Sequence, residues 1–125
     1  MKILSSKGAP AAIGPYSQGI EAGGFCYFSG QIALDPATGE MIQDSFANEV
    51  HQVFKNIGNL LSDNQLEFSN LVKVNISMTD LGKFGELNEI YSSYVNEPYP
   101  ARACVGVASL PKAANVEIEV IAHRP

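Results

Sequence analysis

The sequence LVKVNISM, residues Leu71–Met78, is the clearest strand of the chain. Its apolar residues alternate with Lys73, Asn75 and Ser77. Successive side chains of a strand point to opposite faces, so this period of two predicts a strand with one apolar and one polar face. A sheet of such strands must bury its apolar face against another layer of secondary structure.

A helix is predicted on each side of this strand. Residues 45–64 carry apolar side chains at spacings of three, four and seven, and Asp44 or Ser45 can cap the N-terminus. Residues 81–95 show a second apolar helical face and follow Asp80, a suitable cap.

Four further strands are predicted at residues 17–22, 25–33, 101–108 and 116–123, and residues 1–15 are expected to be extended or loop. The resulting order, ββαβαββ, favours an α+β fold in which one mixed sheet carries both helices on one face. Several residues of the other face are apolar, and we expect a partner subunit to cover them.

Length and composition predict a single soluble globular domain spanning residues 1–125. Apolar residues make up 46% of the chain and charged residues 17%. The net charge is −5, and the eight Lys and Arg residues form no cluster. Both features argue against nucleic acid and against a membrane surface as partners.

Cysteine usage and the N-terminal sequence favour an intracellular protein. Cys26 and Cys104 are the only cysteines, which is too few for a disulfide framework. The first residues hold no apolar run long enough for a signal peptide, and no stretch is long enough to span a membrane. We expect a cytoplasmic location.

The segment PARACVGV, residues 100–107, poses the main chemical question. It reads as a buried strand, yet it contains Arg102, whose charge cannot be removed. If the last two strands pair, Arg102 would lie near Glu117. One interpretation is a structural ion pair with Glu117 or Glu119. The other is a guanidinium that binds a carboxylate ligand, and both remain open at this point.

Other reactive side chains carry weaker signals. Cys104 lacks an evident activating partner and is more typical of a small buried apolar residue. His51 and His123 lie in no metal-ligand pattern, and no phosphate-binding glycine motif occurs. Tyr16 lies in a Gly-Pro loop, where an exposed tyrosine is ordinary. From the pattern alone, none of these residues identifies a site.

A set of short motifs nevertheless resembles the RidA (YjgF/YER057c/UK114) family from about residue 8 to 123. The motifs occur in the order and spacing of that family. They are Pro15-Tyr16-Ser17-Gln18, Ser29-Gly30-Gln31-Ile32, Asp35-Pro36-Ala37-Thr38-Gly39, Leu87-Asn88-Glu89-Ile90-Tyr91, Pro100-Ala101-Arg102, Leu110-Pro111 and Val116-Glu117-Ile118-Glu119.

The resemblance implies a chorismate-mutase-like subunit assembled as a homotrimer, with clefts between subunits. It also implies hydrolysis of reactive enamine and imine acids, namely 2-aminoacrylate and 2-aminocrotonate with their imine tautomers such as 2-iminobutyrate. The products would be ammonia and a 2-oxo acid. No metal or other cofactor is implied.

Site residues follow from the resemblance by position. Arg102 matches the family residue that grips the substrate carboxylate, and Glu117 matches the residue that handles the attacking water. The positions that line or close the pocket are Tyr16, Gly30, Asn88 and Cys104, with Ser29 as a weaker candidate. One position departs from the family, because Gly106 stands where many relatives carry Glu.

Three alternatives to the enzyme remain. A trimer with carboxylate-binding clefts would sense 2-oxo acids without turnover. The family's older names, endoribonuclease and translation inhibitor, suggest RNA as a ligand, but the low Lys and Arg content argues against that. A chaperone-like role is neither supported nor opposed by the sequence.

Overall fold

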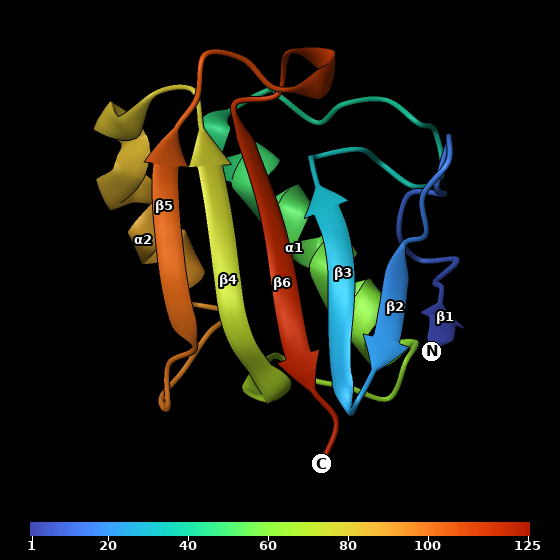
Figure 1. The fold of residues 1–125 in the computed structure, drawn as a ribbon. Helices are drawn as coiled ribbons and strands as arrows, with labels where there is room; N and C mark the ends of the chain where they lie inside the picture. Colours follow the sequence, from blue (N-terminus) through green and yellow to red (C-terminus); the bar gives the residue numbers. More distant parts are fainter.

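The computed structural model describes residues 1–125, which form one sheet backed by two helices (Figure 1). The strands are β1 Lys2–Leu4, β2 Gly19–Ala22, β3 Phe25–Gln31, β4 Leu71–Met78, β5 Ala101–Gly106 and β6 Val116–His123. The helices are α1 Phe46–Ser62 and α2 Phe84–Tyr91, with short 3₁₀ turns η1 Phe68–Asn70, η2 Leu81–Lys83 and η3 Pro111–Ala113.

The six strands lie in the order β1-β2-β3-β6-β4-β5. Only β4 and β5 pair in parallel, and every other neighbouring pair is antiparallel. Both helices cover one face of the sheet, as Figure 1 shows. The predicted α+β class, with a mixed sheet and two helices on one face, is therefore confirmed.

The largest departures from the predicted elements lie at the N-terminus and in the second helix. The first residues form β1, a strand too short to show alternation, which pairs with β2 and buries Leu4. The second helix starts as the turn η2 and ends at Tyr91 instead of residue 95. It ends there because Ser92 and Ser93 donate their hydroxyl hydrogens to nearby backbone carbonyls, which competes with helix continuation.

The structure contradicts the hypothesis that the last two strands pair with each other. β4 lies between β5 and β6, so these two strands do not pair. The parallel crossover through α2 returns the chain to the outer edge of β4, and β6 occupies the other edge. β5 is accordingly an exposed edge strand, not the buried strand that its sequence suggested.

The register assigns the key side chains to faces. Val74 lies opposite Arg102 on one side and Val120 on the other, and it is buried beneath the helices. Ser77 lies opposite both Val105 and Glu117. Because directly paired residues point to the same face, Arg102 faces the helix layer and Glu117 faces the open side.

The core lies between the helices and the sheet. The predicted apolar face of α1 is at most 1% exposed at every position: Val50, Val53, Phe54, Ile57, Leu60 and Leu61. Ser45 caps this helix by accepting a hydrogen bond from the Asn48 amide at 3.0 Å. No helix in the structure combines the length and apolar character that a membrane crossing requires.

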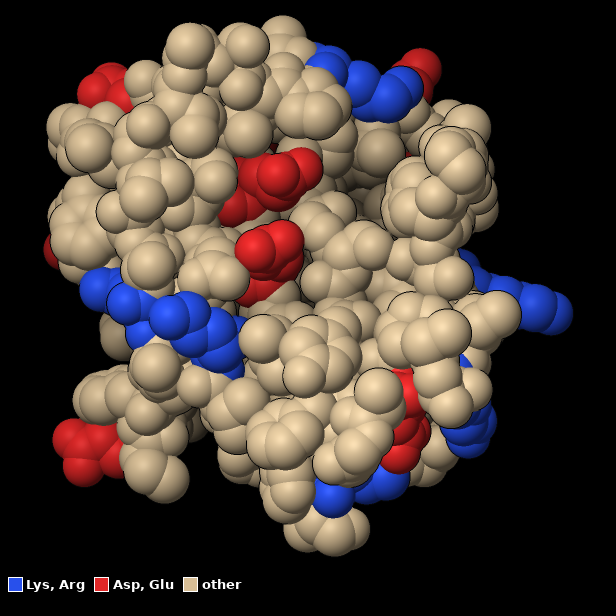
Figure 2. Space-filling model, viewed as in Figure 1, with Lys and Arg blue, Asp and Glu red and all other residues tan.

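The opposite sheet face carries both apolar and acidic side chains. Tyr27 is 46% exposed and Val105 is 52% exposed, which leaves large apolar groups in contact with water. Figure 2, which views this face, shows acidic side chains gathered near its centre, where β6 runs. Glu117 and Glu119 alternate with the buried residues of β6 and point to this side.

Candidate functional site

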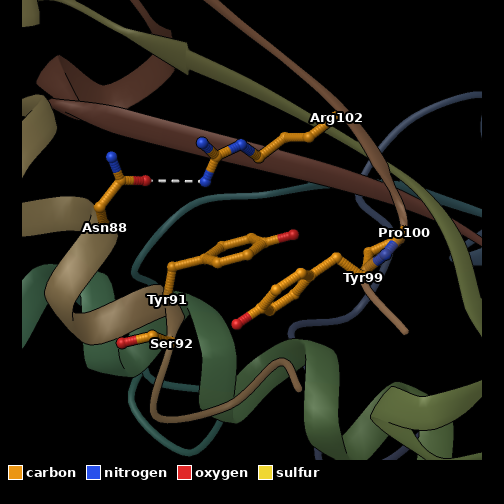
Figure 3. Close-up of a pocket in the computed structure, with 6 residues that line it drawn as sticks. All are labelled: Asn88, Tyr91, Ser92, Tyr99, Pro100 and Arg102. Carbon is orange, nitrogen blue, oxygen red and sulfur yellow. Dashed lines mark hydrogen bonds between the residues drawn. The ribbon is translucent and has the colours of Figure 1, made fainter. Parts of the chain in front are cut away.

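Arg102 is held in a defined orientation at the edge of the sheet. Its Nη1 donates a 2.7 Å hydrogen bond to Oδ1 of Asn88. Its guanidinium carbon lies 4.8 Å from the ring centroid of Tyr91 and 5.3 Å from that of Phe84. Figure 3 shows Arg102 reaching from its strand over the Tyr91 ring to Asn88 on the helix.

The sequence of α2 explains this arrangement. Phe84, Asn88 and Tyr91 are spaced by four and then three residues, so they fall on one helical face, which lies against β5. The guanidinium has five N–H donors, and only one of them is used in this contact. The remaining donors match the two oxygens of a carboxylate ligand.

No carboxylate of the chain neutralises Arg102. The one ion pair within 4.0 Å joins Arg124 to Glu21, far from this strand in the sheet. The first of the two interpretations, a structural ion pair of Arg102 with Glu117 or Glu119, is therefore excluded within one subunit, because Arg102 and these two carboxyls lie on different faces of the sheet. This leaves the anion-binding interpretation as the better supported one.

Two hollows adjoin the guanidinium. One has a volume of about 350 Å³ and is lined by Asn88, Tyr91, Ser92, Tyr99, Pro100 and Arg102 (Figure 3). The other has a volume of about 440 Å³ and is lined by Leu81, Phe84, Arg102 and Cys104. Arg102 thus lies between a hollow with hydroxyl groups and a mainly apolar one.

Cys104 lines the apolar hollow as a thiol. Its Sγ lies 3.7 Å from Sδ of Met78. Burial raises the pKa of the thiol, and the nearby charge of Arg102 only partly opposes this effect. The arrangement disfavours a thiolate nucleophile, which agrees with the lack of an activating partner in the sequence.

A separate cavity of about 390 Å³ contains Glu117. Its lining includes Tyr16, Gln18, Gly30, Gln31, Lys112 and Glu117. Gly30 lets the carboxyl approach, because a Cβ on this residue would lie 2.9 Å from Cδ of Glu117. A β-bulge between Phe28 and Gln31 shifts the pairing of β3 with β6 at this point.

The environment of Glu117 suits proton transfer. Burial raises the pKa of its carboxyl, and the neighbouring charge of Glu119 raises it further. A raised pKa lies closer to neutral pH, where the carboxyl can both accept and release a proton.

No group of three or more His, Cys, Asp and Glu side chains is arranged to hold a metal ion.

The structure divides the six expected site residues into two groups. Arg102, Asn88 and Cys104 form the arginine half-site on the helix-covered face. Tyr16, Gly30 and Glu117 form the glutamate half-site at the other cavity. The weaker candidate Ser29 lies beside that cavity, and its hydroxyl donates to the Ser17 carbonyl at 2.6 Å, next to Tyr16.

Sequence reasoning missed three residues that shape these half-sites. Phe84 and Tyr91 belong to the apolar face predicted for residues 81–95, and their spacing around Asn88 is the signal that could have identified them. Lys112 lines the glutamate half-site, and its backbone adopts a left-handed conformation with a φ of 56°. Nothing in its sequence pattern indicates that conformation.

Comparisons with known proteins place the chain in a family. The family model described as Endoribonuclease L-PSP matches residues 6–124. A 2-iminobutanoate/2-iminopropanoate deaminase from Mus musculus is 43% identical over 121 residues, covering 97% of this chain and 90% of the relative. The chain belongs to the RidA family.

Solved structures agree with this assignment to the RidA family. RidA from an Antarctic Psychrobacter species superposes with a TM-score of 0.93 at 42% identity, covering 98% of this chain and 99% of the other. E. coli TdcF, solved with bound serine, superposes with a TM-score of 0.93 at 36% identity, covering 100% of both chains. The mixed sheet with two helices is therefore the RidA-family fold.

Proposed function

We propose that this RidA-family protein hydrolyses reactive 2-imino acids, formed from 2-aminoacrylate or 2-aminocrotonate, to 2-oxo acids and ammonia. The observation that carries the proposal is the Arg102 guanidinium. It is oriented by Asn88 and Tyr91, it is free of any carboxylate, and it is exposed beside two hollows. The deaminase name of the 43% identical mouse relative supports the same reaction.

The working site requires a second copy of the chain. Arg102 and Glu117 lie on opposite faces of one sheet, so one subunit cannot direct both side chains at a single small substrate. The open face exposes apolar groups such as Tyr27 and Val105, which an adjacent subunit would cover. We propose a homotrimer in which the arginine half-site of one subunit meets the glutamate half-site of its neighbour.

Arg102 would fix the substrate. Its free N–H donors would bind the carboxylate of the imino acid in a bidentate manner, and Asn88 and Tyr91 keep the guanidinium plane oriented. Such positioning lowers the entropic part of the barrier. The thiol of Cys104 and the ring of Phe84 would shape the apolar wall beside the substrate.

Glu117 would transfer the protons. The enamine tautomerises to an imine, whose nitrogen takes a proton and makes the carbon electrophilic. As water adds to that carbon, the Glu117 carboxylate removes a proton from the water. The same carboxyl then protonates the nitrogen of the amino alcohol. The C–N bond breaks and ammonia leaves, and the hydroxyl gives its proton to the Glu117 carboxylate as it becomes the new carbonyl. The raised pKa of Glu117 suits both roles.

A coupled assay tests the activity. A threonine dehydratase supplies 2-aminocrotonate, and the release of 2-oxobutyrate is followed with the wild type, with Arg102→Ala and with Lys55→Ala. Lys55 is an exposed cation on α1 and lines none of the cavities described above, so it controls for loss of charge. We expect acceleration by the wild type and the control and little by Arg102→Ala. The proposal fails if the wild type accelerates formation of the 2-oxo acid from neither 2-aminocrotonate nor 2-aminoacrylate.

A non-catalytic carboxylate-binding protein is the second candidate. The arginine half-site is assembled within one chain and does not need Glu117 to bind an anion. E. coli TdcF, described with bound serine, is a related protein that holds a carboxylate-bearing molecule. This alternative predicts that 2-oxobutyrate binding depends on Arg102, whereas Glu117→Gln changes no reaction rate.

A further inference from the structure

Glu49 is a buried carboxyl that the proposed reaction does not use. It lies in the first turn of α1 and is 1% exposed, an unusual position for an acidic side chain. Its Oε2 accepts a 2.8 Å hydrogen bond from the backbone N–H of Asn115, and its Oε1 accepts a 2.8 Å bond from Nδ2 of the same residue. Gln43 adds a longer contact of 3.5 Å to Oε2. Two donors of one residue therefore converge on one carboxyl.

Asn115 ends a loop with an unfavourable backbone. Within this loop, residues 110–115, Lys112 and Ala113 both have a φ of 56°. Residues with a Cβ avoid this left-handed region, and two in succession persist only where surrounding contacts hold them. The Asn115 carbonyl accepts from the Thr79 N–H at 3.1 Å, and the Ala113 carbonyl accepts from Gln43 at 3.0 Å. Together with Glu49, these contacts fix the end of the loop.

The same loop forms one wall of the glutamate half-site. Pro111 and Lys112 line that cavity together with Glu117. Asn115 precedes Glu117 by only two residues, so its position sets where β6 begins. A displacement of Asn115 would therefore move both Lys112 and Glu117.

We propose that Glu49 is a positioning residue that holds loop 110–115 in its left-handed conformation and so places Lys112 and Glu117 at the cavity. The effect on catalysis rests on the proposed function. Loss of the Glu49 carboxyl frees both Asn115 donors and lets Lys112 and Ala113 relax. Arg102 is held by α2 and is not touched, so the change falls on kcat and not on KM.

The test combines a removal with a relief of strain. Glu49→Ala removes the contact, and Ala113→Gly lets the loop keep a φ near 56° without it, because glycine adopts this region freely. Both single variants, the double variant and the wild type are compared by urea unfolding and by steady-state deamination. We expect Glu49→Ala to lower kcat about tenfold or more while KM stays within about twofold, as a misplaced catalytic group predicts. In the Ala113→Gly background, we expect Glu49→Ala to cause less than half of the decrease in log kcat that it causes in the wild type. The decrease in the free energy of unfolding should likewise be less than half as large.

Two controls separate positioning from general destabilisation. Asn64→Ala removes another largely buried amide, whose Nδ2 donates a 2.7 Å hydrogen bond to the Leu60 carbonyl. Asn64 does not line the cavity of Glu117, so this variant is expected to lower stability with kcat nearly unchanged. Glu49→Gln is expected to retain most of kcat, because its amide oxygen can accept from the Asn115 N–H and its nitrogen can donate to a rotated Asn115 amide. If Glu49→Ala does not fold, Asn115→Ala removes the side-chain half of the contact and should give a smaller loss of the same kind.

Strictly additive effects of Glu49→Ala and Ala113→Gly on stability would overturn the proposal, as would a Glu49→Ala kcat no lower than that of Asn64→Ala. Wild-type protein without deaminase activity would instead overturn the proposed function. The unfolding measurements would still decide whether Glu49 holds the loop, so the two failures are distinguishable.

Discussion

Arg102 and Glu117 point to opposite faces of the same sheet, with β4 between their strands. Each side chain adjoins its own cavity, and each cavity holds part of the residue set that the RidA resemblance indicates. An ion pair between Arg102 and Glu117 inside one subunit is therefore excluded. The same separation makes assembly a requirement of the proposed chemistry.

Gly30 should be sensitive to the smallest substitution. The Cβ of Gly30→Ala would meet Cδ of Glu117 at 2.9 Å, so the carboxyl must move. We expect kcat to fall by about 10- to 100-fold with a smaller change in KM, as for a misplaced catalytic group. Gly85→Ala is the matched control, since its Cβ would meet no atom within 4 Å. Equal activities of the two variants would contradict the close approach at Gly30.

The pH dependence should report the Glu117 carboxyl. Its pKa is raised by burial and by Glu119, and the carboxylate is the form that accepts the proton from water. The rate should therefore fall as the pH decreases through a pKa above the ordinary glutamate range. Glu119→Gln removes the second cause, so the acidic limb of the kcat/KM profile should shift to lower pH. A limb that stays in place would show that another group titrates there.

The same raised pKa predicts a conflict between stability and activity at Glu117. The folded chain binds this proton more tightly than the unfolded chain, so the charged carboxylate lowers stability at pH values above its folded pKa. Glu117→Gln should raise the melting temperature at pH 7 by an amount on the order of a few degrees while abolishing most activity. The difference from wild type should shrink as the pH falls toward roughly 4.3, the ordinary pKa of glutamate. A melting temperature at pH 7 below that of the wild type would contradict this account of Glu117.

Cys104 should be dispensable for bond making. Its pKa is raised and its Sγ lies against Met78. We expect Cys104→Ser to keep activity within about tenfold of the wild type, whereas loss of a true covalent nucleophile costs about 10⁴-fold or more. Mass spectrometry during turnover provides a second reading, since a covalent adduct on Cys104 would contradict the prediction.

Most of the fold could be predicted from local patterns. The alternation in residues 71–78 and the apolar face of α1 each specify an element, and both elements lie where expected. Strand order was not predictable in this way, because pairing of β5 with β4 depends on a crossover between distant residues. The strand β1, Lys2–Leu4, is too short to show a periodic signal.

The candidate site could be predicted only through the family motifs. An arginine in an apolar strand raises the question of an anion, but its partners Asn88 and Tyr91 come from a helix 11 or more residues earlier in the sequence. The contact of Glu49 with Asn115 spans 66 residues and left no pattern at all. The structure also gives Gly106 a local meaning, since a Cβ there would lie 3.1 Å from Cδ1 of Leu81.

Subunit mixing between Arg102→Ala and Glu117→Gln tests directly whether two subunits share one active site. Each variant alone should be inactive. The two variants are mixed in equal amounts, and the formation of mixed trimers is verified by native mass spectrometry. In a mixed trimer, one subunit can supply Arg102 and its neighbour Glu117, so random assembly should restore about one quarter of the wild-type sites. Recovery near that level would establish a site shared between subunits. Mixed trimers that remain inactive would contradict it.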